Sequence, residues 1–241
     1  MKQIAVITPV PEIVNTYLDQ SILRKGKEQG LVEYHVLNLR DFATGNYRQI
    51  DDEPYGGGSG MVLMAEPLFK AIERCFALFE VDDLNEVTVV YPSPQGTLWN
   101  HATALELSKH AYFIFLCGHY KGIDQRVIEK YVTHEYSVGD YILSSGELPA
   151  LLMIDSIVRL VPGVLHSFSS AATDSFYHDL LDAPYYTRPQ EIEGMRIPDV
   201  LLTGHHQEIE TWRQRQRERR TRKRRPDLWK KYLQKTDRLE A

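Results

Sequence analysis

Cysteine is scarce in this chain of 241 residues, which contains only Cys75 and Cys117. The two lie 42 residues apart, each within an apolar run, so they form neither a Cys-x-x-Cys motif nor a disulfide framework. Secreted proteins of small size rely on such frameworks, whereas free thiols persist in reducing compartments. We therefore expect two buried free thiols in a cytoplasmic protein.

Long apolar segments are missing as well. The apolar run at the N-terminus ends at Pro11 and has no signal-peptide cleavage pattern. The most lipid-like window, residues 148–165, is interrupted by Asp155 and Arg159. A membrane span needs about 20 predominantly apolar residues, so this window predicts a buried helix, and no membrane partner is expected.

The common signatures of phosphate and metal binding are also absent. The glycine-rich run DDEPYGGGSGM at 51–61 is not followed by GK[ST], and it does not open a helix as GxGxxG does. A nucleotide-hydrolysing enzyme is therefore disfavoured, and we interpret the run as a flexible acidic loop that contacts substrate or a partner subunit. The nine histidines lack metal-ligand spacing apart from the adjacent His205 and His206, so no metal site is predicted.

The charge of the chain is unevenly distributed. Its composition is globular, with 43% hydrophobic and 25% charged residues and a formal net charge of −5. Residues 213–241, however, contain 13 lysines and arginines against four acids, a net charge of +9, which leaves −14 for the first 212 residues. An acidic body with a basic tail suggests contact with nucleic acid. The alternative is a solvated helical face or an exposed basic arm without a polyanionic partner.

The order of apolar patterns predicts an α/β protein with a mainly parallel sheet. Beyond residue 190 no strand-like run occurs, and Pro226 is expected to separate two helices. We divide the chain into an α/β domain at 1–162, a linker at 163–189 and a helical basic domain at 190–241. The expected strands are 4–10, 32–39, 86–91, 112–117 and 133–138, and the expected helices of the α/β domain are 12–25, 66–80, 101–109, 124–132 and the buried helix within 148–165.

Three glycine-containing loops follow buried strands, at 92–96, 118–124 and 139–149. In open α/β sheets, ligands bind at the carboxyl ends of strands. Glycine allows a backbone to approach a ligand closely, so the loops together predict a site that wraps an adenine and a ribose with main-chain groups. The alternative for each single loop is a tight turn without a ligand.

Charged side chains in two apolar or small-residue contexts are further candidates. Asp155 and Arg159 are spaced i, i+4 on the expected helix and fit either an intrahelical ion pair or a functional pair. Asp174 lies in the Ser/Ala-rich linker, where it fits either a helix cap or a catalytic group.

Seven motifs follow one another along the chain: DDEPYGGGSGMVL, YPSPQG, CGHYKGIDQRV, YSVGDYILSSGELPALLMIDSIVRLVPGVL, TDSF, LLDAPYYTRP and LLTGHH. In this order they resemble the motifs of bacterial tRNA (guanine-N1)-methyltransferases, from about residue 4 to about residue 225. The resemblance implies a SPOUT-type α/β domain with a deep trefoil knot, a small all-helical C-terminal domain, a homodimer and S-adenosylmethionine as methyl donor. It also implies that N1 of the guanosine immediately 3′ of the anticodon of tRNA is methylated, which maintains the reading frame.

The resemblance also assigns residues. Asp174 corresponds to the general base, Arg159 to its partner near the guanine, and the basic tail to tRNA contact through Arg213, Arg217, Arg220 and Arg224. The alternative is a catalytically silent RNA-binding protein on the same fold. The donor pocket is expected to comprise Tyr91, Pro92, Gly118, Tyr120, Ser137, Val138, Gly139, Asp140, Tyr141, Ile142, Leu143, Gly146 and Pro149.

Four positions depart from the motif pattern. His119 replaces an arginine and Ser145 a glycine, while Lys121 and Thr173 stand where many relatives carry glutamate. Magnesium prefers oxygen ligands, so the loss of two carboxylates argues against carrying over the magnesium dependence of the family.

Overall fold

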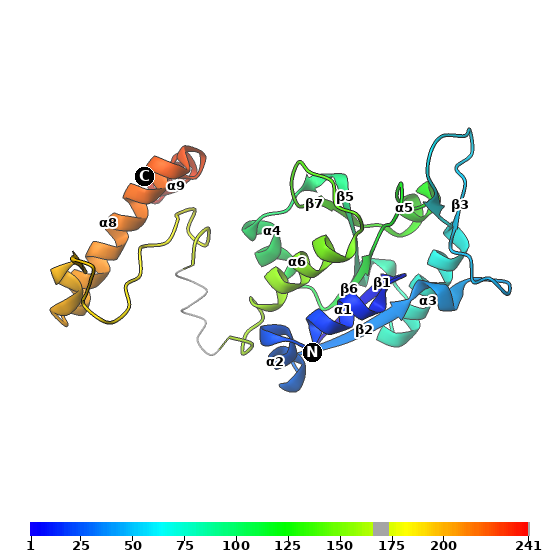
Figure 1. Ribbon diagram of the computed structural model, residues 1–241, viewed down its shortest axis with the longest axis horizontal. Coiled ribbons are helices and arrows are strands. Elements are labelled where there is room, and N and C mark those ends of the chain that lie inside the picture. The colour runs from blue at the N-terminus through cyan, green and yellow to red at the C-terminus, as the bar shows by residue number, and fades with distance from the viewer. Residues whose placement is uncertain (166–173, 241) are drawn as a thin grey trace. The chain divides into compact units, whose positions relative to one another are not determined.

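A computed structural model describes residues 1–165 and 174–240 of the chain (Figure 1). The chain forms two compact units, Met1–His166 and Ser167–Ala241. Both cysteines are free and buried, which confirms the prediction for the thiols. None of the helices in the described ranges is long and apolar enough to cross a membrane.

The first unit is built on a five-stranded sheet in which every neighbouring pair is parallel, which confirms the predicted α/β class. The central strands are continuous apolar runs because both of their faces are covered. Strands β6, β5 and β7 are neighbours, so the segments that follow them meet at one edge of the sheet. The sheet order is β2 (Val32–Asn38), β1 (Lys2–Thr8), β6 (Tyr112–Leu116), β5 (Val87–Leu98) and β7 (His134–Ser137).

Helices cover both faces of this sheet and form two separate apolar cores (Figure 1). One core contains Leu68, Ile72 and Cys75 of α3 packed against Ile114 and Leu116 of β6. The other is formed against the opposite face by helices α1, α2, α4 and α6. The helices are α1 (Pro11–Leu18), α2 (Ser21–Glu28), α3 (Ala65–Phe79), α4 (His101–Leu107), α5 (Gln125–Tyr131) and α6 (Glu147–Val158), with 3-10 turns η1 (Leu39–Phe42) and η2 (Leu84–Glu86).

Two segments of the first unit differ from the sequence expectation. The single helix expected at 12–25 is two helices, because Asp19 caps the first and Ser21 adopts a positive φ of 48°. The glycine-rich run is enclosed by a short antiparallel hairpin of β3 (Asp51–Asp52) and β4 (Val62–Leu63). Backbone bonds from Leu63 to Gly122 and from Lys121 to Met61 join this hairpin to the loop after β6.

The second unit is mainly helical, as predicted, and Pro226 occupies the first position of its last helix, where proline is tolerated. It also contains a small hairpin that hydropathy did not predict, because its strands are too short to show a period. The turn of this hairpin is Glu193-Gly194, both with positive φ, as hairpins of this length require. Its elements are β8 (Glu191–Ile192), β9 (Met195–Arg196), η3 (Asp199–Leu202), α8 (His206–Arg224) and α9 (Pro226–Glu240).

The described part of the expected linker packs within this second unit. The backbone N–H of Leu181 donates to Oγ1 of Thr221, a fully buried residue of α8, at 2.7 Å. Leu180 and Ala183 are buried with it. Residues 174–183 are therefore held along α8 through side-chain and backbone contacts.

Candidate functional site

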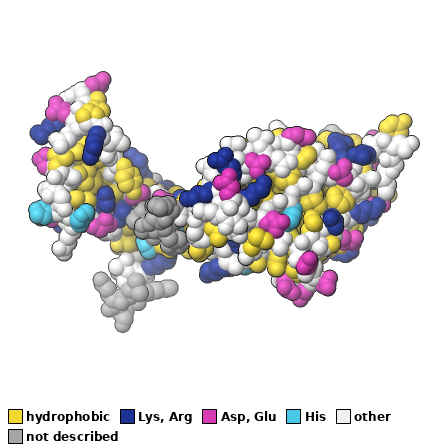
Figure 2. All heavy atoms as spheres, turned by 90° about the horizontal axis from the view of Figure 1, so that it is seen from below, with side chains coloured by type: hydrophobic (Ala, Val, Ile, Leu, Met, Phe, Trp, Pro, Cys, Tyr) yellow, Lys and Arg dark blue, Asp and Glu magenta, His cyan; other side chains and the backbone are white. Residues whose placement is uncertain are grey.

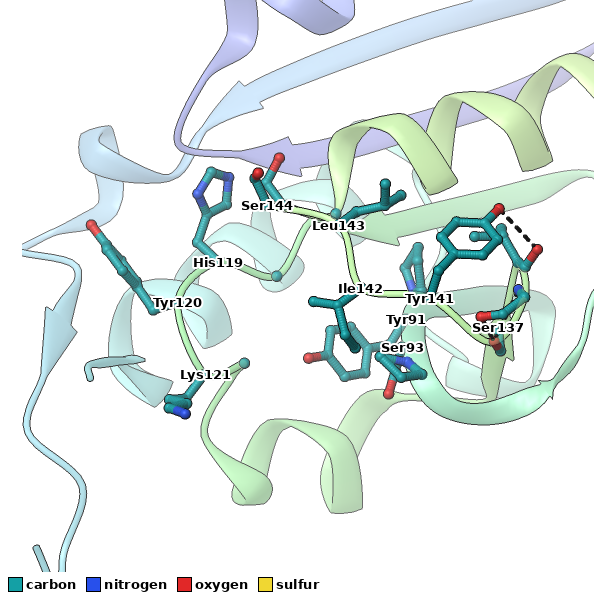
Figure 3. A pocket seen from close by; sticks show the side chains of 18 residues that line it. Tyr91, Ser93, His119, Tyr120, Lys121, Ser137, Tyr141, Ile142, Leu143 and Ser144 are labelled. Carbon is teal, nitrogen blue, oxygen red and sulfur yellow. Dashed lines mark hydrogen bonds between the residues drawn. The ribbon is translucent and has the colours of Figure 1, made fainter. Parts of the chain in front are cut away.

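The three glycine-containing loops lie together, as the strand order requires, and line a cavity of about 390 Å³ (Figure 3). The loop of His119, Tyr120 and Lys121 forms one side of it, and the loop of Tyr141 and Ile142 faces that side. The site thus occupies the carboxyl end of three adjacent parallel strands, where α/β sheets bind their ligands.

Eleven of the thirteen residues expected in the donor pocket line this cavity. The two that do not are Asp140, which is exposed at the tip of its loop, and Pro149, which is buried within the first turn of α6. The eleven are Tyr91, Pro92, Gly118, Tyr120, Ser137, Val138, Gly139, Tyr141, Ile142, Leu143 and Gly146.

Seven further residues line the cavity and were not chosen from the sequence. The only signal that marked them is their position beside the chosen residues in the same loops. They are Ser93, Pro94, His119, Lys121, Gly122, Ser144 and Ser145.

Glycine is required where the loop after β6 lies against the start of α6. A Cβ on Gly146 would lie 2.6 Å from the backbone nitrogen of Gly118, and the N–H of Gly146 donates to the carbonyl of Gly118 at 2.8 Å. A Cβ on Gly118 would lie 3.0 Å from the ring of Tyr91. Because backbone atoms cannot move aside as flexible side chains can, larger residues here would separate the two walls of the cavity.

The lining suits a flat, partly apolar ligand held by main-chain groups. Ile142 is 80% exposed and Tyr141 55% exposed, although both are apolar residues beside the cavity, and a bound ring system would cover them. The hydroxyl of Tyr141 donates to the carbonyl of Val138 at 3.1 Å, which fixes the ring at the rim (Figure 3).

A buried polar group behind the cavity was missed by sequence reasoning. Glu147, the first residue of α6, is only 1% exposed. Its Oε1 accepts a hydrogen bond from Oγ1 of Thr8 at 2.6 Å and one from Nε2 of His119 at 2.8 Å. Burial acts to raise the pKa of Glu147, but hydrogen bonding by His119 and by the hydroxyls of Ser145 and Thr8 lowers it below the ordinary value of 4.5.

The predicted charged candidates lie in different parts of the chain. Arg159 is the C-cap of α6, and Asp155 on the same helix accepts from the hydroxyl of Tyr17 of α1 at 3.4 Å. Asp174 belongs to the second unit, where it lines a separate cavity of about 600 Å³ beside α8 and α9. Thr173 lies outside the described residues. No group of three or more potential metal-ligating side chains occurs among the residues that the structure describes.

The four arginines expected to contact RNA differ in exposure. Arg217 is 12% exposed, with Nη1 at 2.8 Å from Glu210 and Nε at 3.5 Å from Asp182. Arg220 donates to the backbone carbonyl of Asp182 at 3.3 Å, and Arg213 is 41% exposed at 3.6 Å from Glu210. Arg224 is exposed near the end of α8. Two of the four are thus engaged in holding residues 174–183.

Another row of cations on α8 faces solvent. Arg215, Arg219, Arg222 and Lys223 are exposed and, with Glu218 and Trp229, line a shallow groove of about 680 Å³. None of the four makes an ion pair with any residue in the described ranges. Figure 2 shows cationic side chains on this unit beside apolar and acidic ones.

Comparison with known proteins gives a consistent family. The model of the family described as "tRNA (Guanine-1)-methyltransferase TrmD" matches residues 1–231. A protein of Christiangramia forsetii is 50% identical over 226 residues, which cover 94% of this chain and 98% of that protein. A protein of Brevibacillus brevis is 46% identical over 238 residues, which cover 99% of this chain and 95% of that protein. A protein of Clostridioides difficile is 44% identical over 230 residues, which cover 95% of this chain and 98% of that protein. Each is named tRNA (guanine-N(1)-)-methyltransferase.

Proposed function

The chain belongs to the tRNA (guanine-1)-methyltransferase family, and on that premise we propose that it methylates N1 of the guanosine immediately 3′ of the anticodon of tRNA. S-adenosylmethionine is the donor in this proposal. The observation that carries it is the cavity at the ends of β5, β6 and β7, which the residues of the family's motifs line. The SPOUT-type knot belongs to the same proposal, and it is supported by the match to the family over residues 1–231.

Donor binding is assigned to the three loops. Tyr91 is only 7% exposed and forms the floor beside Gly118 and Gly122, while the backbone of 137–143 provides donors and acceptors. When bound, S-adenosylmethionine supplies an electrophilic methyl group, so the protein contributes binding, orientation and electrostatics. We assign no donor contact to Asp140 or Pro149, whose positions lie away from the cavity lining.

The guanine must lose a proton before it can react, because N1 carries one at neutral pH. We assign Asp174 as the base that accepts this proton, a contribution of about 10²–10⁴ in rate for a well-placed group. Negative charge then develops on O6 of the base, and the guanidinium of Arg159 is assigned to stabilise it. The support is the TDSF motif and the position of Arg159 at the end of α6.

RNA binding is assigned to the solvent-facing side of α8. The stripe of Arg213, Arg217, Arg220 and Arg224 follows helical spacing, but Arg217 and Arg220 hold the segment of Asp182. The exposed row of Arg215, Arg219, Arg222 and Lys223 carries the free positive charge that phosphates attract. Trp229 beside this row stacks on Tyr232, with ring centroids 5.4 Å apart, so its main role is packing within the unit.

Self-association is assigned to the face formed by α1 and α6. These helices touch through Tyr17 and Asp155, and four large side chains on them are 45–60% exposed. Exposed apolar residues that cluster on one face mark interaction surfaces. We infer a homodimer through Ile13, Tyr17, Leu148 and Leu152. A cytoplasmic location is part of the same proposal and is supported by the two buried free thiols.

A transfer assay with matched substrates tests the proposed function. Purified protein is incubated with labelled S-adenosylmethionine and with two tRNA transcripts that differ only in carrying G or A after the anticodon. We expect label in the G transcript and none in the A transcript. Binding of both transcripts without transfer to either would favour the catalytically silent RNA-binding protein instead.

A further inference from the structure

Glu147 is a buried carboxylate to which neither donor binding nor proton transfer assigns a role. It is 1% exposed, and it lies just outside the set of residues that line the cavity. A buried charge is costly unless it is paired and hydrogen-bonded. The contacts of Glu147 must therefore offset the free-energy cost of burying its charge.

The contacts of Glu147 join three segments that are distant in sequence. Thr8 is the last residue of β1, His119 belongs to the loop after β6, and Glu147 itself begins α6. Thr8 extends the connection, because its Oγ1 also accepts from the backbone N–H of Val10 at 2.9 Å, just before α1. The position of Glu147 at the start of a twelve-residue helix further favours its negative charge.

Next to these contacts, two walls of the donor cavity meet: the loop that follows β6 and the segment that leads into α6. His119 and Ser145 form an isolated antiparallel bridge, and the N–H of Gly146 donates to the carbonyl of Gly118. Main-chain hydrogen bonds and the His119–Glu147 contact hold the 118–122 loop against the start of α6. The histidine side chain is 17% exposed, and His119 is one of the residues that line the cavity.

We propose that Thr8, Glu147 and His119 form a positioning unit that fixes the 118–122 wall of the donor cavity against α6. The unit acts through the loop and not on the reacting atoms, so these are positioning residues. This inference rests on the proposed function only in taking the cavity as the donor site. It predicts that loss of the His119 contact weakens donor binding, whereas a substitution that keeps an N–H donor to Glu147 preserves it.

Calorimetric binding of S-adenosylmethionine to the full chain tests the proposal with His119→Ala, His119→Arg and a matched control. A hydrogen bond to a charged group contributes more than one between neutral groups, so we expect that loss of this bond in His119→Ala raises the donor Kd about tenfold. His119→Arg should stay close to wild type, because arginine also donates to a carboxylate. The control is His110→Ala, which removes a 2.7 Å contact with Thr88 at the opposite end of the strands and should leave the donor Kd unchanged.

A double-mutant cycle separates positioning from general stability. His119→Ala leaves the buried Glu147 charge with fewer partners, whereas His119→Ala with Glu147→Gln does not, so the two changes should be non-additive in amide exchange of residues 118–122 and in donor Kd. If His119→Ala does not fold, Thr8→Val removes one contact of the same carboxylate and should raise the donor Kd by a smaller factor.

Two results would overturn the proposal. One is a His119→Ala or Thr8→Val protein that melts at a lower temperature yet binds the donor as wild type does. The other is a His119→Arg protein as weak in donor binding as His119→Ala. A wild-type protein that binds no S-adenosylmethionine would instead overturn the proposed function itself, together with this inference.

Discussion

Glu147 is a charged residue whose side chain is buried away from water. Its pKa is lowered because hydrogen bonds favour the ionised form more strongly than burial disfavours it. A carboxyl with a lowered pKa in the folded state stabilises the fold above its unfolded pKa and loses that contribution as pH falls through the folded value. The free energy of unfolding of the first unit should therefore decrease as the pH falls into the acid range.

Comparison of wild type with Glu147→Gln across pH measures this contribution. At pH 7 we expect wild type to be more stable, by about 1.5–3 kcal/mol, because hydrogen bonds to an ionised carboxylate are stronger than those to a neutral amide. The difference should shrink as pH falls below the ordinary value of 4.5. Denaturant unfolding at several pH values provides the measurement, and a difference that grows toward low pH would contradict the assignment.

Asp174 is the residue on which turnover is predicted to depend. Asp174→Asn removes the proton acceptor but keeps the size of the side chain, so we expect turnover to fall about 10²–10⁴-fold with donor affinity unchanged. Asp179→Asn is the matched control, since Asp179 lies in the same segment and contacts Lys235. Single-turnover rates and donor Kd are the readouts. Parallel loss of donor binding in Asp174→Asn would assign this residue to structure.

At the scale of elements, α8 has two basic sides with different tasks. Arg217 is mostly buried against Asp182 and Glu210, whereas Arg215 and Arg219 are exposed and unpaired within the described ranges. Spacing along the helix cannot distinguish these sides, because both stripes contain arginine at every turn. The difference arises from residues 179–183, which pack on one side only.

Because only one basic side of α8 is exposed, loss of arginines from the two sides should affect tRNA binding differently. Arg215→Ala with Arg219→Ala should weaken tRNA binding and reduce the slope of log K against log salt by about one per lost phosphate contact. Arg217→Ala removes one charge but should chiefly lower the melting temperature. Filter binding at several salt concentrations measures the slope. An unchanged slope in the double variant would place the RNA contact elsewhere.

Helices and strands could be predicted from the sequence where neighbouring residues alone determine them. The continuous apolar runs of β1, β5 and β6 gave their positions, and Pro226 marked the boundary between α8 and α9. The three loops could be placed together because parallel strands share an edge. The Thr8–Glu147–His119 contact could not be predicted, since it joins residues up to 139 positions apart and depends on side-chain packing. The burial of Arg217 was missed for the same reason.

At the scale of the whole molecule, α1 and α6 carry apolar side chains that are exposed to solvent in the single chain. Leu148 is 60% exposed and Leu152 46% exposed. Leu148→Glu with Leu152→Glu should convert a dimer to a monomer, because each new charge would be desolvated in the interface. Light scattering after gel filtration gives the mass, with Leu202→Glu as an exposed control in the second unit. A wild-type protein that is monomeric at micromolar concentration would contradict the inferred dimer.

The whole molecule combines an acidic α/β unit with a basic helical region, which the net charge of −5 conceals. The first unit provides the cavity, and the second carries Asp174 and the exposed cations. In the proposed function, donor binding belongs to the first unit, whereas proton removal and tRNA recognition belong to the second.

Identification of the methylated nucleoside tests this account most directly. After reaction of the wild-type protein with S-adenosylmethionine and the G-containing transcript, the tRNA is digested to nucleosides and analysed by chromatography with mass spectrometry. The account predicts 1-methylguanosine, derived from the position immediately 3′ of the anticodon. Methylation of another atom of guanine, of another position, or no methylation at all would contradict it.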